Sequence, residues 1–202
     1  MKKDRKIFTI LTLSVLCALV LGLFPVSGEE KVYDSVVRLH VLANSDSEAD
    51  QELKLKVRDR IIEVTKELFS RAQTKEDAER IARSALSFIE REAETVVEEN
   101  GFTYPVSVEL GQEEYPERDY EGLKFPAGEY LSLRVMIGDA EGQNWWCVLF
   151  PPMCVGAASG GVAIVNPNER PEAVGEGAWH IVSRSGEYEL RFRFLELLSG
   201  NQ

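Results

Sequence analysis

The chain has 202 residues, of which 44% are apolar and 28% are charged, and this composition is typical of a globular protein rather than a disordered or fibrous one. Its 34 acidic residues outnumber its 23 basic residues, for a formal net charge of -11. Neutralising nucleic-acid phosphates needs a basic patch, and none is evident, so we expect no nucleic-acid partner.

The first 28 residues have the pattern of an export signal. Four basic side chains between Met1 and Lys6 precede the uncharged, mostly apolar run from Ile7 to Phe24. Gly28, a small residue just before Glu29, marks a cleavage site, and a retained signal anchor is the alternative. In both cases residues 29–202 form a single exported domain, which contacts the membrane only through the N-terminal segment. Beyond residue 28 there are 19 basic and 33 acidic residues, a net charge of -14.

Export bears on the cysteines. Cys17 lies in the leader, so the exported part keeps only Cys147 and Cys154. In an oxidising compartment these two can form a disulfide, and two buried thiols are the alternative. The only histidines, His40 and His180, are not at a ligand spacing from a cysteine, so we expect no metal site and no cofactor.

A strand and two helices are predicted first in the domain. Residues 36–43 alternate as a strand does, and Ser47 then has the pattern of an N-cap for a helix that ends near Ser70. Thr74 begins a second helix that ends at Asn100. The short connection predicts an antiparallel helical hairpin. The first helix carries two apolar lines, so it needs two neighbours: the second helix and a sheet, or a partner protein.

Strands dominate the rest of the chain. Alternation predicts strands over residues 104–110, 130–138 and 145–150, with the last two paired as a hairpin, and a final strand over residues 187–195. Residues 111–126 have the composition of an acidic loop, and residues 155–178 that of a glycine-rich loop. The fold class predicted is α+β, with the helical hairpin packed on a mainly antiparallel sheet behind the N-terminal signal or anchor helix.

No catalytic signature is present. The sequence lacks a zinc-protease helix motif, a nucleophile elbow and a phosphate loop. A nucleophilic pair of Cys147 with His40 or His180 is weighed and disfavoured, because Cys147 lies in a hydrophobic run where a thiolate is costly. We therefore expect a protein that is not an enzyme.

Two segments resemble the signature segments of the stage II sporulation protein R family. The first runs from Arg38-Leu-His-Val-Leu-Ala-Asn-Ser-Asp-Ser47 to Val57-Arg58-Asp59. The second runs from Phe125-Pro-Ala-Gly-Glu-Tyr130 through Asn144-Trp-Trp-Cys-Val-Leu-Phe-Pro-Pro152 to Cys154. The resemblance covers most of residues 36–154, and the leader fits it.

The resemblance implies a signalling protein of endospore-forming bacteria. Such a protein is exported from the forespore into the space between the two membranes and switches on a membrane-embedded aspartic protease, which matures pro-sigma-E. A secreted hydrolase acting on cell-wall material in the same space is the alternative, with His40, Cys147 or a carboxylate pair in catalysis.

Candidate partner-binding residues lie in these same segments. The alternative role for the residues between Asn44 and Asp50 is to cap the helix, and for the tryptophans to fill the core. The candidates are Arg38, His40, Asn44, Asp46, Asp50, Gln51, Arg58, Gln143, Asn144, Trp145 and Trp146.

Overall fold

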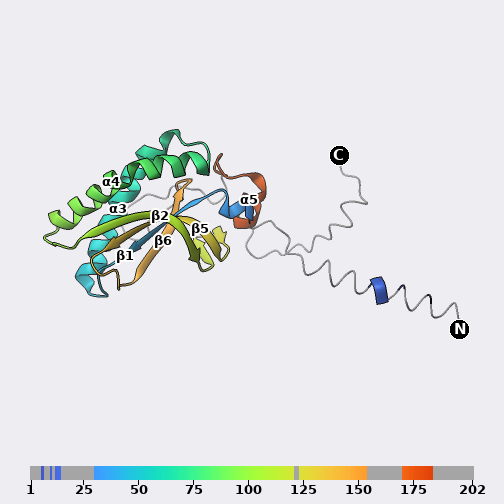
Figure 1. Ribbon diagram of the computed structural model, residues 1–202, viewed down its shortest axis with the longest axis horizontal. Coiled ribbons are helices and arrows are strands. Elements are labelled where there is room, and N and C mark those ends of the chain that lie inside the picture. Colours follow the sequence, from blue (N-terminus) through green and yellow to red (C-terminus); the bar gives the residue numbers. More distant parts are fainter. Residues whose placement is uncertain are drawn as a thin grey trace.

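The computed structural model describes residues 6, 10, 12–14, 30–120, 123–153 and 170–183 (Figure 1). The fold is of the mixed α+β class, as predicted, with helices α3 and α4 lying along one side of a sheet. The elements are, in chain order, α2 (Glu30–Tyr33), β1 (Val37–Leu42), α3 (Glu48–Leu68), the 3-10 turn η1 (Phe69–Arg71), α4 (Lys75–Glu99), β2 (Val106–Tyr115), β3 (Arg118–Tyr120), β4 (Leu123–Phe125), β5 (Gly128–Ile137), β6 (Asn144–Phe150) and α5 (Glu176–Ser183).

The main sheet has the strand order β2-β5-β1-β6. Strand β1 pairs parallel with β5 and antiparallel with β6, and β2 pairs antiparallel with β5. The predicted hairpin of residues 130–138 with 145–150 is therefore wrong, because β1 lies between these two strands. The physical reason is the burial of β1: Val37, Leu39 and Val41 are fully enclosed, and a strand in such surroundings needs partners on both edges.

Capping side chains fix where the two long helices begin. Ser47 accepts a hydrogen bond from the backbone N–H of Asp50, and Thr74 accepts one from that of Asp77, so both predicted N-caps are confirmed. Lys56 on α3 reaches Asn100 at the end of α4, and Arg60 pairs with Glu92. The two helices therefore run in opposite directions along each other.

The helix pair covers one face of the sheet and forms the larger core. From α3, Leu53, Val57 and Ile61 point into it, and Ala82 and Ile89 do so from α4. Burying such aliphatic side chains contributes roughly 1.5–3 kcal/mol for each large one. Ile62 and Phe69, from the second apolar line of the first helix, also pack in this core. The intramolecular core thus accounts for these two residues without a partner protein.

The other face of the sheet is covered by small elements. Helix α2, the β3–β4 hairpin and helix α5 pack there around Val36, Tyr115, Phe125 and Tyr130. The predicted acidic loop over residues 111–126 is wrong, because β2 continues to Tyr115 and is followed by β3 and β4. The apolar residues of β2 do not alternate regularly along the whole strand. Its buried residues face the helix pair up to Leu110 and the opposite side beyond it, so the period of two is interrupted.

Part of the predicted glycine-rich loop is helical. Within residues 155–178, the structure describes residues 170–178, and α5 begins there at Glu176. The predicted strand over residues 187–195 lies outside the described residues, as does most of the leader. Among the residues that the structure describes, no helix combines the length and apolar character needed to cross a membrane.

Candidate functional site

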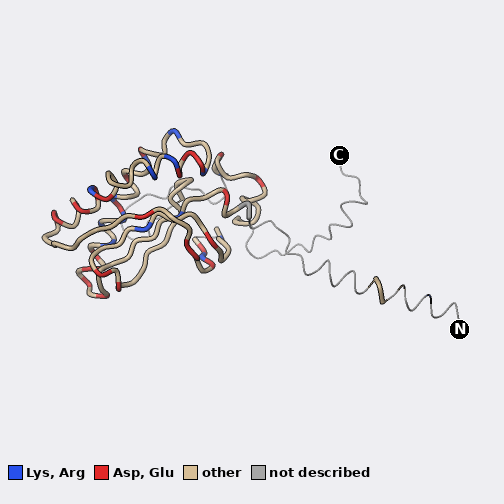
Figure 2. The backbone as a smooth tube through the Cα atoms, in the orientation of Figure 1, with Lys and Arg blue, Asp and Glu red and all other residues tan. Residues whose placement is uncertain are grey.

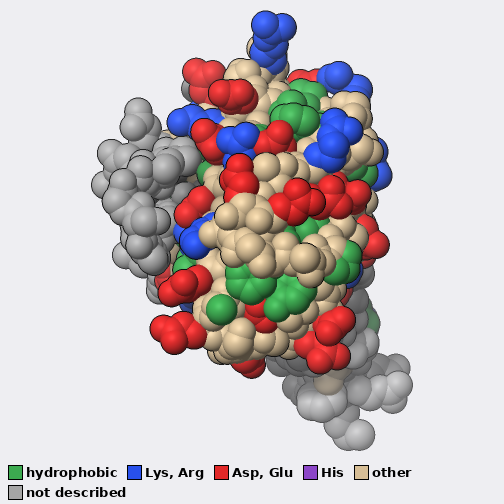
Figure 3. Space-filling view, turned by 90° about the vertical axis from the view of Figure 1, so that its left-hand side faces the viewer, with side chains coloured by type: hydrophobic (Ala, Val, Ile, Leu, Met, Phe, Trp, Pro, Cys, Tyr) green, Lys and Arg blue, Asp and Glu red, His purple; other side chains and the backbone are tan. Residues whose placement is uncertain are grey.

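Most of the predicted candidates lie in two places in the fold, and Arg58, Asn144 and Trp145 lie apart from both. One is a polar corner, which we define as residues 44–51 together with the β5–β6 connection, residues 138–143. The other is the face of the sheet opposite the helix pair, where Arg38, His40 and Trp146 point. The start of α3, the end of α4 and the β5–β6 connection lie together at the left-hand end of Figure 1. Figure 3 views that end of the molecule, and acidic side chains are spread across it around a small hydrophobic patch.

Asp50 is the centre of the polar corner. Its carboxylate accepts hydrogen bonds from Ser45 Oγ (2.6 Å) and Asn44 Nδ2 (2.9 Å), while its backbone N–H donates to Ser47. The hydrogen bond from Ser45 is the main reason that the pKa of Asp50 lies below its ordinary value, with smaller contributions from Asn44, Tyr104 and Ser47 that outweigh burial. Asp50 is almost fully buried, so it holds the corner together and has little surface to offer a partner.

The β5–β6 connection is tied to this corner by further hydrogen bonds. The backbone N–H of Gln143 donates to Asp46 (2.8 Å), and that of Asp139 donates to Asn44 Oδ1 (3.0 Å). Lys54, buried in α3, donates to Gln51 Oε1 and to the carbonyl of Gln143. Burial lowers the pKa of the Lys54 ammonium group. The two signature segments thus form one bonded unit although they are distant in sequence.

Two glycines permit this close approach. Gly138 has a φ of +59°, and a Cβ there would lie 2.2 Å from Asn44 Oδ1. A Cβ at Gly142 would lie 2.2 Å from the backbone oxygen of Ser45. Neither position has room for a side chain, so the contact between the two segments depends on glycine at both.

Arg58 and Trp145 form a separate pair on the helix side of the sheet. The guanidinium of Arg58 lies 4.3 Å from the centre of the Trp145 ring, and Arg58 is 1% exposed. A cation over an indole face is stabilising, and more so when it is shielded from water. Both side chains therefore serve packing, in line with the structural role considered for the tryptophans. Asn144, at the start of β6, is exposed.

Arg38 lies inside a box of aromatic rings on the opposite face. Its guanidinium is 4.3–5.5 Å from the ring centres of Tyr115, Tyr130, Phe125 and Tyr120, and the side chain is fully buried. It donates to the carbonyl of Cys147 and to the hydroxyl of Tyr120. No carboxylate of the described residues pairs with it. Arg38 is therefore enclosed and cannot contact a partner directly.

A hydrogen bond to Glu113 on β2 holds the ring of His40 on β1, across the intervening strand β5. Burial would raise the pKa of Glu113, but hydrogen bonds from His40 and Ser132 and the nearby charges of His40 and Arg134 bring it below its ordinary value. Since an ionised carboxylate only accepts hydrogen bonds, Nδ1 of His40 donates to Glu113 Oε1 over 2.8 Å. Nε2 of His40 then points away from Glu113 and has no hydrogen-bond partner.

Trp146 completes this face beside His40. The two ring centres lie 5.3 Å apart, and Arg118 from β3 lies 4.1 Å above the indole ring. Trp146 is half-buried, as are Arg118 and Arg134. Sequence reasoning missed Arg118 and Glu113 because both fall in the segment predicted to be an acidic loop. The apolar alternation of residues 106–110 does not continue through residues 111–114, so it could not place Glu113 on a strand.

Cys147 is on the other side of the sheet from His40. It packs with the helix-side core, whereas His40 faces the aromatic box, so the nucleophilic pair considered for these residues is not formed. Cys147 is also disulfide-bonded. Cys154 lies outside the described residues, as do Gly28 and Glu29, so the pairing of the two cysteines and the cleavage site remain predictions. His180, on α5, is exposed. No cluster of metal-ligating side chains occurs in the described part of the chain.

Comparisons with known proteins bear on both segments of the polar corner. The family model for stage II sporulation protein R matches residues 33–159. The chain belongs to the stage II sporulation protein R family. It is 36% identical over 137 residues to the stage II sporulation protein R of Bacillus subtilis (strain 168), a match that spans 68% of this chain and 61% of that protein. No solved structure matches the chain.

The family match contains both candidate places. The polar corner and the face around His40 and Trp146 lie within residues 33–159, whereas α5 lies beyond them. The family assignment therefore applies to the part of the fold in which the two signature segments contact each other.

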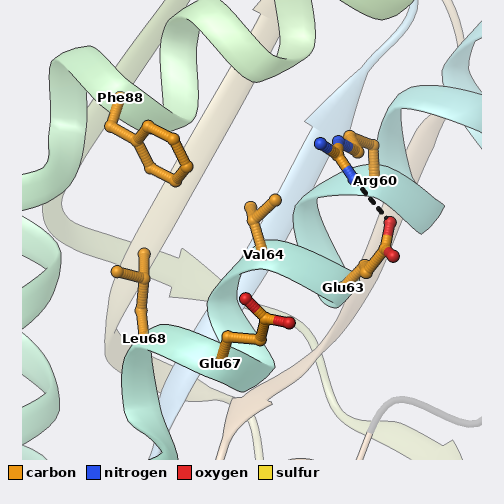
Figure 4. Close-up of a pocket in the computed structure, with 6 residues that line it drawn as sticks. All are labelled: Arg60, Glu63, Val64, Glu67, Leu68 and Phe88. Atoms are coloured by element: carbon orange, nitrogen blue, oxygen red, sulfur yellow. Dashed lines mark hydrogen bonds and ion pairs between the residues drawn. The ribbon is translucent and has the colours of Figure 1, made fainter.

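A shallow groove lies elsewhere, between the outer surfaces of α3 and α4. Figure 4 shows Phe88 on α4 facing Val64 and Leu68 on α3, with Arg60, Glu63 and Glu67 along one side. Its volume is about 390 Å³, and Phe88 is 38% exposed. No candidate predicted from the sequence lines it. Acidic and basic residues both occur along the two helices in Figure 2, so the surroundings of the groove carry charges of both signs.

Proposed function

We propose that this chain is an exported signal of endospore formation that activates a membrane-embedded aspartic protease and so leads to pro-sigma-E processing. The observation that carries the proposal is the family match over residues 33–159. The leader pattern of residues 1–28 supports export into the space between forespore and mother cell. The aspartic protease is then the receptor, in the opposite membrane.

Binding rather than catalysis is the mechanism that we propose. A ligand changes a receptor only through a different affinity for its two states, so the domain must present a surface that fits the active arrangement of the protease. The polar corner supports this role because its hydrogen bonds hold Asp46 and Gln143 in place at the surface. Rigid presentation of exposed groups lowers the entropy lost on association.

The test is co-expression of the full chain with the protease and a pro-sigma-E reporter in a host that does not sporulate. We expect processing only when all three are present. A chain lacking residues 1–28 is the control for export, and it should fail to trigger processing when it is made in the same cells. Processing that is independent of the chain would contradict the proposal.

A secreted hydrolase is the second candidate, and one observation favours it. Glu113 holds His40 through Nδ1 and leaves Nε2, a buried atom, without a hydrogen-bond partner, and carboxylates orient histidines that act as general bases in the same way. The test is release of fragments from purified cell wall by the wild-type chain and by His40→Gln. Hydrolysis that is lost in His40→Gln would establish this function, and absence of hydrolysis in both would exclude it for that substrate.

A further inference from the structure

Buried polar atoms without a hydrogen-bond partner gather on one face of the sheet. In a folded protein such groups are few, and each calls for an explanation. Among the described residues the face opposite the helix pair contains Arg38 Nη1, His40 Nε2, Glu113 Oε2, Arg118 Nε and Arg134 Nε. Arg38 is closed off by its aromatic box. Of the other four residues, His40 and Arg118 lie against the Trp146 ring, and Glu113 and Arg134 lie on the far side of His40. We call His40, Glu113, Arg118, Arg134 and Trp146 together the Trp146 surface.

Charges of both signs lie on this face of the sheet. The Oε1 atom of Glu113 lies 2.8 Å from His40 Nδ1 and 3.8 Å from Arg134 Nε, and Glu109 is in register with Arg134 on the same face. Arg118 has no ion-pair partner in the described part of the chain, and its guanidinium lies on the Trp146 ring. The residues beyond position 28 have a net charge of -14, so a guanidinium without a carboxylate partner is unusual here.

The available groups define the chemistry of a ligand. Arg118 offers a planar set of N–H donors, which matches a carboxylate. His40 is 6% exposed, and its unpartnered Nε2 lies on the side of the ring away from Glu113, next to Trp146. The exposed part of the indole ring offers an apolar contact. A peptide segment with an acidic side chain beside an apolar one matches the Arg118 guanidinium and the Trp146 ring together.

We propose that the Trp146 surface binds an acidic segment of the protein receptor, with a carboxylate of that segment on Arg118 and an apolar neighbour on the Trp146 ring. This rests on the proposed function, because the receptor is taken to be the membrane-embedded protease. An anionic membrane is a poorer fit, since the domain as a whole is strongly acidic and is repelled by such a surface.

The experiment compares charge variants of the full chain, co-expressed with the protease. The variants are Arg118→Glu, Arg118→Lys and, as the matched control, Arg83→Glu on the exposed side of α4. Copurification with the protease from detergent-solubilised membranes measures binding, and the reporter measures pro-sigma-E processing. We expect at least a tenfold loss of copurification for Arg118→Glu, a smaller loss for Arg118→Lys, which keeps the charge but not the planar donors, and a value near wild type for Arg83→Glu.

Charge exchange identifies the partner group. Replacing the acidic residues in the extracytoplasmic segments of the protease by lysine, one at a time, should yield one variant that binds Arg118→Glu better than it binds the wild-type chain. Thermal unfolding of the variants controls for folding. Wild-type copurification by Arg118→Glu overturns the proposal, and so does a loss for Arg83→Glu as large as the loss for Arg118→Glu.

Two further outcomes distinguish this proposal from the proposed function and from an acidic segment supplied by the chain itself. If the wild-type chain copurifies with the protease but no processing occurs, the proposed function fails and the Trp146 surface is still decided by the Arg118 variants. If a chain ending at Ser183 copurifies better than the full chain, and Arg118→Glu removes this difference, the acidic segment belongs to the chain itself and the proposal is overturned.

Discussion

The guanidinium of Arg38 lies 4.3 Å from the centre of the Tyr115 ring, and neither side chain has appreciable contact with solvent. A buried cation normally needs a carboxylate, because losing hydration is costly. Here the faces of four aromatic rings, the Tyr120 hydroxyl and the Cys147 carbonyl take that place. The arginine of the first signature segment therefore joins β1 to β2, β3, β4 and β5.

Arg38→Ala should destabilise the domain strongly. The change removes the cation–ring contacts and leaves a cavity lined by polar tyrosine hydroxyls, so we expect a loss of about 3–5 kcal/mol in the free energy of unfolding. Denaturant unfolding followed by tryptophan fluorescence measures it. Arg83→Ala, on the exposed side of α4, is the control and should cost less than about 0.5 kcal/mol. Similar losses in the two variants would show that the aromatic box does not depend on the cation.

Asp50→Asn should weaken the acid dependence of stability. The pKa of Asp50 is lowered in the folded state, so its contribution is present above the ordinary value of 3.8 and is lost as the pH falls through the folded pKa. We expect the wild-type chain to lose more stability than Asp50→Asn between about pH 5 and pH 2. At neutral pH the variant should be less stable by about 1–2 kcal/mol, since it loses charge-assisted hydrogen bonds.

The control for this change is Glu52→Gln, on the exposed side of the same helix. Its unfolding free energy should stay within about 0.5 kcal/mol of wild type at neutral pH. If Asp50→Asn has the same pH profile as the wild type, the carboxylate is not the group that Ser45 and Asn44 stabilise.

Gly142→Ala should separate the two signature segments. A Cβ at this position meets the backbone oxygen of Ser45, which cannot move without disturbing the polar corner, so we expect a loss of about 1–3 kcal/mol. Gly111→Ala is the control, because a Cβ there has nothing within 4 Å. Thermal unfolding compares the two, and an effect of equal size would mean that the close approach at Gly142 is unimportant.

In an oxidising compartment the chain should contain a disulfide between Cys147 and Cys154. Mass spectrometry of the unreduced protein after alkylation in denaturant should show neither cysteine modified. In Cys154→Ser the thiol of Cys147, which is 2% exposed, should react with an alkylating reagent only when the chain is unfolded. Alkylation of both cysteines in the unreduced wild-type chain would support the alternative of two buried thiols.

Local signals predicted the helices well, and pairing between distant segments was not predictable in the same way. The side chains of Ser47 and Thr74 act within one turn of chain, so their sequence context was sufficient. The partners of β1 depend on which strands can reach both of its edges, and alternation in residues 130–138 and 145–150 says nothing about that.

The sequence indicated the residues of the candidate site that act locally, and it did not indicate those that strand pairing brings in from a distance. Asp50 and Asn44 belong to a capping sequence that can be recognised locally, although their role is to tie the corner together rather than to present an open surface. Glu113 and Arg118 reach the Trp146 surface through the fold of β2 and β3. Their place beside His40 depends on a strand pairing that sequence patterns do not specify.

The position of β1 in the sheet also sets an order for folding. This strand is made before both long helices, while its two partners, β5 and β6, are made after them. The centre of the sheet therefore stays unpaired until most of the domain has been synthesised, and such non-local contacts form slowly. Until β5 and β6 are made, the domain lacks the centre of its main sheet, and a chain in that state is what the export proposed above would need.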